Sequence, residues 1–143
     1  MFPAYLNGDI TSLNDTLKAT NETYVPTFTW TAGGTPPTVT NIQAKYSVMA
    51  KICFVYIRYQ ITNLGTPGNS ANLKISLPEG IVPILDSLSM VSEYQTDSVV
   101  SKTLGVRISS GGFINTIQGI GGNNSGTYIP TGYQGFSAYF MIN

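Results

Sequence analysis

Apolar and polar residues alternate along most of the chain, with a period of two residues from position 24 onward. Such alternation is typical of half-buried strands in antiparallel sheets, whereas a helix repeats about every 3.6 residues. Clusters of Gly, Pro, Asn and Ser interrupt the alternation at 33–37, 65–72 and 121–126. The predicted strands are 24–30, 41–49, 51–61, 73–77, 87–94, 102–109, 113–120 and 135–143. Many short strands separated in this way predict an all-β domain, an antiparallel sandwich or barrel.

Two of the predicted strands, 51–61 and 135–143, carry apolar residues on both faces. Their first faces are apolar throughout. Their second faces include Ile52, Phe54, Tyr56, Tyr139 and Met141. A strand of a two-layer sandwich has only one inner face. We therefore expect a neighbouring subunit to cover part of the outer face at these five side chains.

The first segment follows a different pattern. Its apolar residues Leu6, Ile10, Leu13 and Leu17 are spaced four, three and four apart, which matches the seam of a coiled coil with its repeat of about 3.5 residues. This stripe is narrow for a helix that packs on a globular core, and so short a helix is marginal in isolation. We expect residues 1–22 to form a helical neck that associates with its counterparts, and residues 23–143 to form a β head. A single helix lying on the domain is the alternative.

Composition restricts the partners. The 143 residues fit one domain, and only 10% of them are charged, against about 25% in ordinary soluble domains. Seven basic and seven acidic residues give no net charge, which argues against nucleic acid and anionic lipid as partners. No stretch approaches the ~20 apolar residues of a membrane span. A neutral surface rich in hydroxyl and amide groups suits sugars or further copies of the chain.

The supply of reactive groups is small. The chain has no His and a single cysteine, Cys53, so neither an internal disulfide nor a zinc site of the usual Cys/His kind can form. We expect Cys53 to be a buried, inert thiol, and we expect no metal and no cofactor. Without His there is no ordinary Ser or Cys triad. Glu93 and Asp97 resemble a glycosidase pair only in being two carboxylates, and we expect them on an exposed strand end or loop. The sequence therefore predicts a protein that is not an enzyme.

Aromatic and amide residues are the candidates for ligand binding. Sugar sites combine an aromatic face with amide or backbone groups that bind hydroxyls. The candidate residues are Asn123, Asn124, Tyr128, Tyr133, Tyr94 and Trp30. Binding residues are most frequent on loops held by a rigid scaffold, which favours residues 121–128. Trp30 also fits a place in the core. The Asn- and Gly-rich loop at 121–126 also fits a hairpin turn.

Several short motifs occur in a fixed order between residues 24 and 80. A strand with Trp30 precedes an A-x-Y strand at 44–46, and a basic residue then opens the apolar strand 51–57. The loop GTPGN at 65–69 and the strand LKISLP at 73–78 follow. This order resembles the heads of bacteriophage tail fibres and receptor-binding proteins, and the final strand GFSAYFMIN is similar to the last strand of such heads. Those heads usually have a Gly after the A-x-Y motif, whereas this chain continues with Val, Met, Ala and Lys.

The resemblance implies a homotrimeric, jelly-roll-like head that a helical neck joins to a fibre of the virion. It further implies adhesion to a glycan or protein of the host surface, so that the partners are other copies of the chain, an upstream fibre or virion protein, and the host receptor. Two other kinds of protein fit the sequence. One is a purely structural virion tip or trimerisation protein without a receptor site, and the other is a cellular carbohydrate-binding module.

Overall fold

The computed structural model of the protein describes residues 21–67, 72–94, 102–118 and 131–143. These residues form strands and their connections, and no helix occurs among them. The strands are β1 (Glu22–Thr23), β2 (Phe28–Trp30), β3 (Gly34–Thr35), β4 (Thr38–Met49), β5 (Ile52–Asn63), β6 (Thr66–Pro67), β7 (Leu73–Ser76), β8 (Ser87–Tyr94), β9 (Lys102–Ser109), β10 (Phe113–Gln118) and β11 (Gly132–Met141). Every pairing between them is antiparallel. The prediction of an all-β, antiparallel domain is therefore confirmed for these residues.

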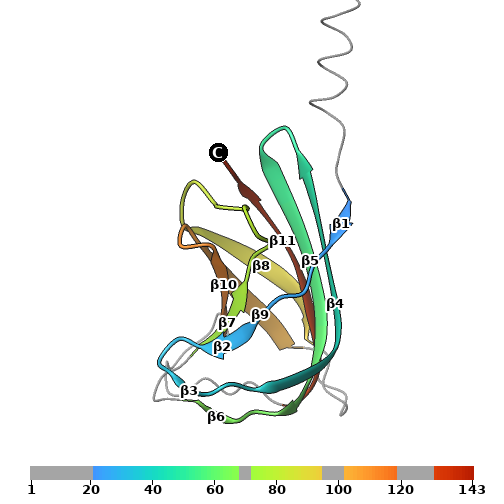
Figure 1. Ribbon diagram of the computed structural model, residues 1–143, viewed down its shortest axis with the longest axis vertical. Helices are drawn as coiled ribbons and strands as arrows, with labels where there is room; N and C mark the ends of the chain where they lie inside the picture. Colours follow the sequence, from blue (N-terminus) through green and yellow to red (C-terminus); the bar gives the residue numbers. More distant parts are fainter. Residues whose placement is uncertain (1–20, 68–71, 95–101, 119–130) are drawn as a thin grey trace, which may run out of the picture.

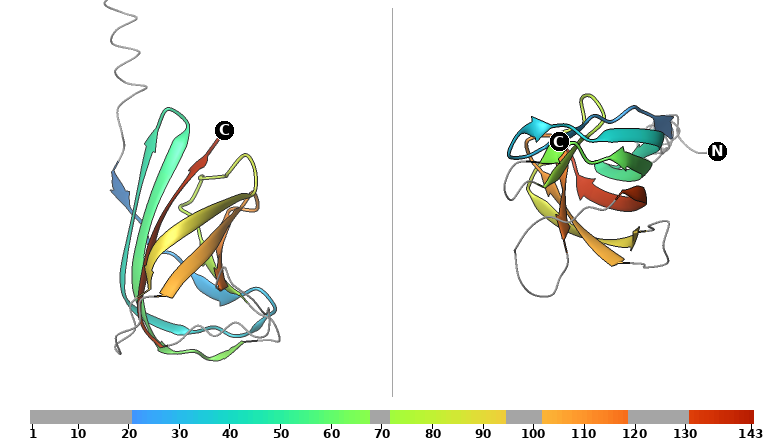
Figure 2. Two further views of the ribbon diagram at one scale, coloured as in Figure 1. Left: turned by 180° about the vertical axis from the view of Figure 1, so that it is seen from behind. Right: turned by 90° about the horizontal axis from the view of Figure 1, so that it is seen from below.

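Nine strands form one sheet in the order β1-β4-β5-β11-β8-β9-β10-β7-β2, and β3 pairs separately with β6. The sheet bends between β11 and β8, so that β1, β4, β5 and β11 form a front layer that faces a back layer of β8, β9, β10, β7 and β2 (Figures 1 and 2). The two edge strands, β1 and β2, are neighbours in sequence and are joined by residues 24–27. The five residue steps from Thr23 to Phe28 span at most about 18 Å, so this connection keeps the two edges of the sheet near each other. The result is consistent with a β-sandwich.

The core lies between the two layers. It consists of Phe28, Trp30, Ala44, Cys53, Val55, Ile57, Tyr59, Ile61, Leu73, Ile75, Leu77, Val106, Ile108, Ile114, Phe136, Ala138 and Phe140. Along β5 the odd-numbered residues from 53 to 61 are buried, as the period of two predicts. The rings of Phe28 in β2 and Tyr59 in β5, 4.8 Å apart between centroids, join the layers. The Tyr59 hydroxyl donates to Oε1 of the buried Gln134 at 2.8 Å, so this polar pair is satisfied inside the core.

Two predicted segments differ from the structure. The predicted strand 24–30 is wrong in its extent, because only residues 22–23 and 28–30 pair and residues 24–27 connect two strands. Pro26 lies within this connection and has no N–H to donate to a ladder. The predicted loop 33–37 contains the short strand β3, which pairs with β6.

The tight turn predicted between 41–49 and 51–61 is confirmed as a two-residue hairpin turn. Met49 pairs with Ile52, and the two residues between them, Ala50 and Lys51, have φ of 47° and 65°. Positive φ at both positions is the geometry of a type I′ turn, which matches the twist of the flanking strands and favours Asn-Gly. This hairpin holds β4 and β5 in continuous register from the turn as far as the pair of Gln43 and Arg58.

Candidate binding surface on the front layer

The outer face of the front layer, which points away from the core, carries rows of side chains that cross β4, β5 and β11. Residues paired across adjacent strands lie on the same side of a sheet, so the register defines these rows. From the hairpin turn onward the rows are Met49–Ile52–Met141, Ser47–Phe54–Tyr139, Lys45–Tyr56–Ser137 and Gln43–Arg58–Gly135. Apolar residues dominate the first rows and polar residues the last. The outer face therefore changes its chemistry along the strands.

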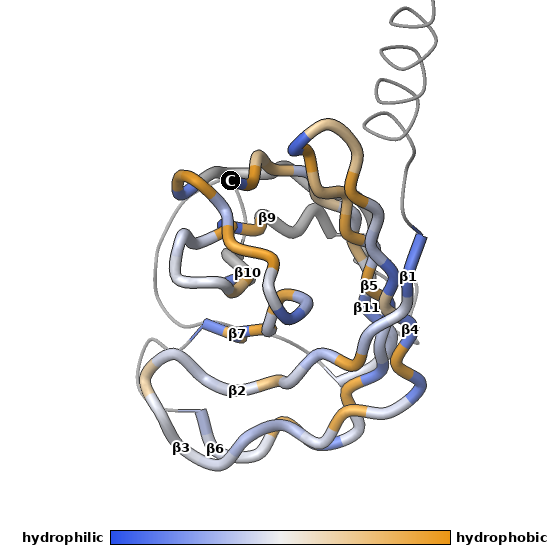
Figure 3. The backbone as a smooth tube through the Cα atoms, turned by 45° about the horizontal axis from the view of Figure 1, so that its top comes forward, coloured by the Kyte–Doolittle hydropathy of each residue, from blue (hydrophilic) through white to orange (hydrophobic). Residues whose placement is uncertain are grey.

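The apolar part of this face comprises Met49, Ile52, Phe54, Tyr56, Tyr139 and Met141, which we call the apolar patch. Phe54 is 45% exposed, and Tyr139 and Met141 are 67% and 64% exposed. The rings of Phe54 and Tyr139 lie 6.2 Å apart between centroids, so they form a continuous surface across two strands. Hydrophobic positions recur along β5 (Figure 3). The described chain itself does not cover these side chains, and the covering by a further copy stays a prediction.

The segment 82–85 extends the apolar patch beyond what the sequence indicated. The N–H of Ile84 donates to the carbonyl of Met141 at 3.0 Å, which holds the segment beside the end of β11. Ile84 and its neighbour Leu85 both expose their side chains. The alternating pattern predicts no strand between residues 77 and 87, and no period reveals that residues 82–85 lie next to the last strand.

A second group on the outer face, Asn41, Arg58, Gln60 and Tyr133, forms what we call the Tyr133 cluster. Nδ2 of Asn41 donates to Oε1 of Gln60 at 2.6 Å and to the Tyr133 hydroxyl at 3.2 Å. The Arg58 guanidinium carbon lies 5.4 Å from the centroid of the Tyr133 ring, within the range of a cation–π interaction. A guanidinium, two amides and a phenol are thus held together on one sheet face.

A β-bulge positions Asn41. The pairing of β4 with β5 shifts between Thr40 and Gln43, so two residues of β4 stand opposite Tyr59 alone. Asn41 occupies the bulge with φ of 51°. Among residues other than Gly, Asn tolerates this left-handed conformation best. Bulges redirect side chains at the places where they occur, and here the redirected amide reaches both Gln60 and Tyr133.

Gly135 stands opposite Arg58. The two residues are paired across β11 and β5, and a Cβ on Gly135 would lie 3.3 Å from the carbonyl oxygen of Ile57 and 3.6 Å from Cβ of Arg58. The contact with Arg58 would be an ordinary one, and the Arg58 side chain lies diagonally over Tyr133. The cluster therefore borders a position of β11 that has no side chain.

An open trough of about 880 Å³ shares Phe54 and Tyr56 with the apolar patch. Its lining approaches the Tyr133 cluster at Gln43, which pairs with Arg58. Its lining is Asn21, Thr23, Tyr24, Val25, Ile42, Gln43, Ala44, Lys45, Tyr46, Ser47, Phe54, Val55 and Tyr56. The lining mixes amide, hydroxyl, ammonium and aromatic groups, and its volume lies within the range of about 300–1,000 Å³ that is usual for ligand sites.

Two tyrosines shape one wall of the trough. The rings of Tyr24 and Tyr46 pack edge to face, 5.9 Å apart between centroids. The Tyr46 hydroxyl donates to Oε2 of Glu22 at 2.7 Å, and this hydrogen bond is the main cause that raises the pKa of Tyr46. Burial raises the pKa of Tyr24, whose hydroxyl has no hydrogen-bond partner among the described residues. Both phenols therefore stay protonated at neutral pH.

The charges on the outer face are unbalanced. Lys45 and Arg58 are exposed on this face, and among the described residues no carboxylate lies within salt-bridge distance of either. Lys45 in β4 and Arg58 in β5 belong to neighbouring rows and are diagonal to each other. Side chains of adjacent strands are still within reach in this position. The outer face therefore presents two neighbouring basic side chains, although the chain as a whole has no net charge.

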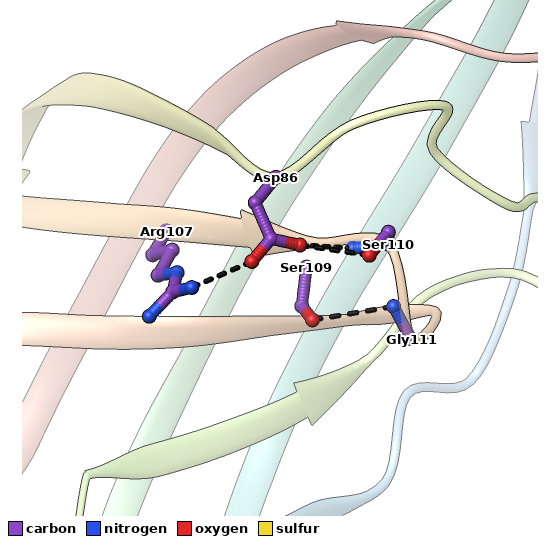
Figure 4. Close-up of polar contacts among 5 residues, drawn as sticks. All are labelled: Asp86, Arg107, Ser109, Ser110 and Gly111. Atoms are coloured by element: carbon purple, nitrogen blue, oxygen red, sulfur yellow. Dashed lines mark hydrogen bonds and ion pairs between the residues drawn. The ribbon is translucent and has the colours of Figure 1, made fainter.

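Arg107 in the back layer shows the opposite arrangement (Figure 4). Its guanidinium lies 2.5 Å from the Asp86 carboxylate, which also accepts from the N–H and hydroxyl of Ser110 at 2.7 and 2.9 Å. These contacts lower the pKa of Asp86 to about 2. The hydrogen bond from the Ser110 N–H is the main cause, and the Arg107 guanidinium is a further one. Asp86 thereby ties the start of β8 to the turn between β9 and β10.

The predicted ligand-binding residues lie in different parts of the structure. Tyr133 belongs to the Tyr133 cluster. Trp30 is 6% exposed, and its indole N–H donates to the Thr35 carbonyl at 3.1 Å, so it lies in the core. Tyr94 ends β8 and pairs with Gln134 at the bend of the sheet. The remaining predicted positions lie outside the described residues: Asn123, Asn124 and Tyr128, and the neck residues Leu6, Ile10, Leu13 and Leu17.

Neither a metal-binding group nor a match to a known protein indicates what this surface binds. Within the described part of the chain, no three Cys, Asp or Glu side chains gather to hold a metal ion. The described residues also include no helix that could span a membrane. Comparisons of the chain with family models, curated proteins and solved structures found no match.

Proposed function

We propose that this chain is the receptor-binding head of a viral fibre, carried on the virion and without enzymatic activity. In this proposal the head is a jelly-roll-like homotrimer with a coiled-coil neck at residues 1–22. Its partners are its own copies, an upstream fibre or virion protein, and a glycan or protein on the host surface. The observation that carries the proposal is the apolar patch, which is exposed in the single chain on a regular sheet face.

The size of the apolar patch supports its burial against a further copy. If a whole aromatic side chain has about 150–250 Å² of surface, the exposed fractions amount to on the order of 500 Å². The largest apolar patch of a typical monomer is about 300–600 Å² and is often functional, and a stable interface buries about 800 Å² per partner. The patch would supply more than half of such an interface. Three-fold closure buries it identically in every subunit, and the number three rests on the resemblance to fibre heads.

The Tyr133 cluster favours receptor binding over a purely structural role. A structural tip needs the apolar patch but has no use for amide, phenol and guanidinium groups held together on an exposed face. Such groups, with an aromatic residue among them and an open trough beside them, are what binding sites for polar ligands contain. The cluster adjoins the apolar patch, so a trimer would carry three copies of the site near its interfaces.

Sedimentation analysis of the full chain, combined with binding of the labelled protein to bacterial cells and to extracted surface glycans, tests the proposal. We expect a trimer that binds cells. A trimer that binds no cell or glycan would indicate the structural tip instead. A monomer that binds glycans would indicate a cellular carbohydrate-binding module. Either result would overturn the proposal.

A further inference from the structure

We propose that the Tyr133 cluster, together with Lys45, binds an acidic saccharide through the carboxylate of the sugar. This inference rests on the proposed function, because it names the class of receptor for the same head. It goes further in placing the site on the strands of the front layer and in assigning the charge of the ligand.

The charge of Arg58 is uncompensated among the described residues. In the described part of the chain its guanidinium takes part in no salt bridge and no hydrogen bond, and its one polar contact is with the Tyr133 ring. A guanidinium presents five N–H donors in a planar fork that matches a carboxylate. The Tyr133 ring restricts the side chain before any ligand arrives, so less conformational entropy is lost on binding.

Hydrogen-bond donors and acceptors lie beside Arg58. Nδ2 of Asn41 is used by Gln60 and Tyr133. Among the described contacts, Oδ1 of Asn41 and Nε2 of Gln60 remain open, and the Tyr133 hydroxyl still has its own proton to donate. One acceptor and two donors next to a cation match a sugar that carries hydroxyls beside a carboxylate. A carboxylate without hydroxyls would leave the amides unused.

The surface next to Arg58 has room for more than one sugar unit. Lys45 lies diagonally across from Arg58, and its row leads into the trough of about 880 Å³. Lys45 and Gln43 both belong to the lining of that trough. A second acidic unit, or the hydroxyls of a neutral one, would therefore meet an ammonium and an amide. The site takes an oligosaccharide rather than a single sugar.

Nucleic acid is the competing anionic ligand, and the observations disfavour it. A nucleic acid-binding surface depends on a broad positive field that neutralises many phosphates. This chain has no net charge, and the outer face offers two cations next to the apolar patch. Two cations with fixed amides suit one or two carboxylates in a defined position better than a continuous phosphate backbone.

The test uses the full chain and a panel of oligosaccharides that contain galacturonic acid, glucuronic acid or sialic acid. Each is compared with its methyl ester, which keeps the hydroxyls and removes the charge, and binding is measured by calorimetry. We expect at least one acid to bind, and its ester to bind about 10- to 100-fold more weakly, as for the loss of a charged hydrogen bond. Equal binding of acid and ester would overturn the assignment of charge.

Variants then locate the site. Arg58→Gln should weaken binding of the acid about 10- to 100-fold and leave that of the ester nearly unchanged. Arg107→Gln is the matched control, because it removes the same charge from the back layer, and it should leave binding unchanged. Asn41→Gly preserves the positive φ while it removes the amide, and it should weaken binding of acid and ester alike. Circular dichroism and solution mass should be the same for all three variants.

The remaining outcomes are each decisive. If no acid of the panel binds, the inference fails, while cell adhesion, measured separately, still decides the proposed function. If the acid binds and Arg58→Gln and Arg107→Gln behave alike, the site lies elsewhere. If a single-stranded oligonucleotide binds more tightly than every acid and depends on Arg58, the ligand class is wrong.

Discussion

Substitution of Phe54 tests whether the apolar patch is an interface between copies of the chain. Phe54 is 45% exposed in the single chain, so a neighbour that covers it would bury on the order of 90 Å² of its surface. At about 25 cal/mol per Å², this burial stabilises the contact by about 2 kcal/mol. Phe54→Ala should therefore weaken each contact by roughly 30-fold. Phe54→Glu should do more, because it also places an unpaired carboxylate in the interface, which costs several kcal/mol.

Sedimentation velocity over a wide range of protein concentrations measures this effect. The wild type should sediment as a trimer, Phe54→Ala should dissociate at higher concentrations than the wild type does, and Phe54→Glu should be monomeric or precipitate. Thr29→Glu is the control, because it adds the same charge to an exposed position of β2 in the back layer, opposite Lys74. This control should keep the mass of the wild type. Far-ultraviolet circular dichroism should show that all soluble variants are folded.

Three results would refute the reasoning. A wild type that is monomeric at every concentration would show that the apolar patch has no partner copy. A Phe54→Glu variant that remains a trimer as stable as the wild type would show that the assembly uses another surface. Equal dissociation by Phe54→Glu and Thr29→Glu would also count against the patch, because the effect would then be one of charge alone.

Three further predictions concern the head itself. Ala50→Asn combined with Lys51→Gly should raise the free energy of unfolding in urea by about 1 kcal/mol, because both positions have positive φ and a type I′ turn favours Asn-Gly. The lowered pKa of Asp86, about 2, means that its carboxylate stabilises the fold above its unfolded pKa of about 3.9 and ceases to do so as the pH falls through the folded value. Urea unfolding should show stability falling between about pH 4 and 2, and Asp86→Asn should reduce this fall. Burial raises the pKa of Cys53 to about 11, so a thiol reagent at pH 8 should modify it in denaturant but not in the folded protein, and fast modification of the folded protein would contradict its burial.

The regular strands could be predicted because the pleat of a strand enforces a period of two. In β5 and β11 the buried residues are those that the alternation assigned to one face. The short pairings could not be predicted in the same way. β3 and β6 contain two residues each, too few to show any period, and residues 24–27 alternate in sequence although they connect two layers.

The candidate site was less predictable than the fold. Tyr133 was among the candidates, but its partner Asn41 is 92 positions away in sequence, and the register that joins them depends on a bulge. From the sequence alone, Arg58 is only the polar end of an apolar strand, and Gly135 is only an ordinary glycine of a strand. The rule that binding residues lie on loops directed attention to 121–128. Strands held in register by a hairpin can also align polar groups.

The composition of β5 explains why one sheet face combines two kinds of chemistry. Its even-numbered residues all lie on the outer face, and from the hairpin turn they run from Ile52 and Phe54 through Tyr56 to Arg58 and Gln60. Because neighbouring strands extend each of these residues into a row, the gradient along β5 becomes a gradient across the whole face. A slip of one residue in register would exchange inner and outer faces and remove both the apolar patch and the Tyr133 cluster. Self-association and ligand binding, as proposed, would then depend on the same hairpin register, with the interface near the turn and the ligand site beyond it.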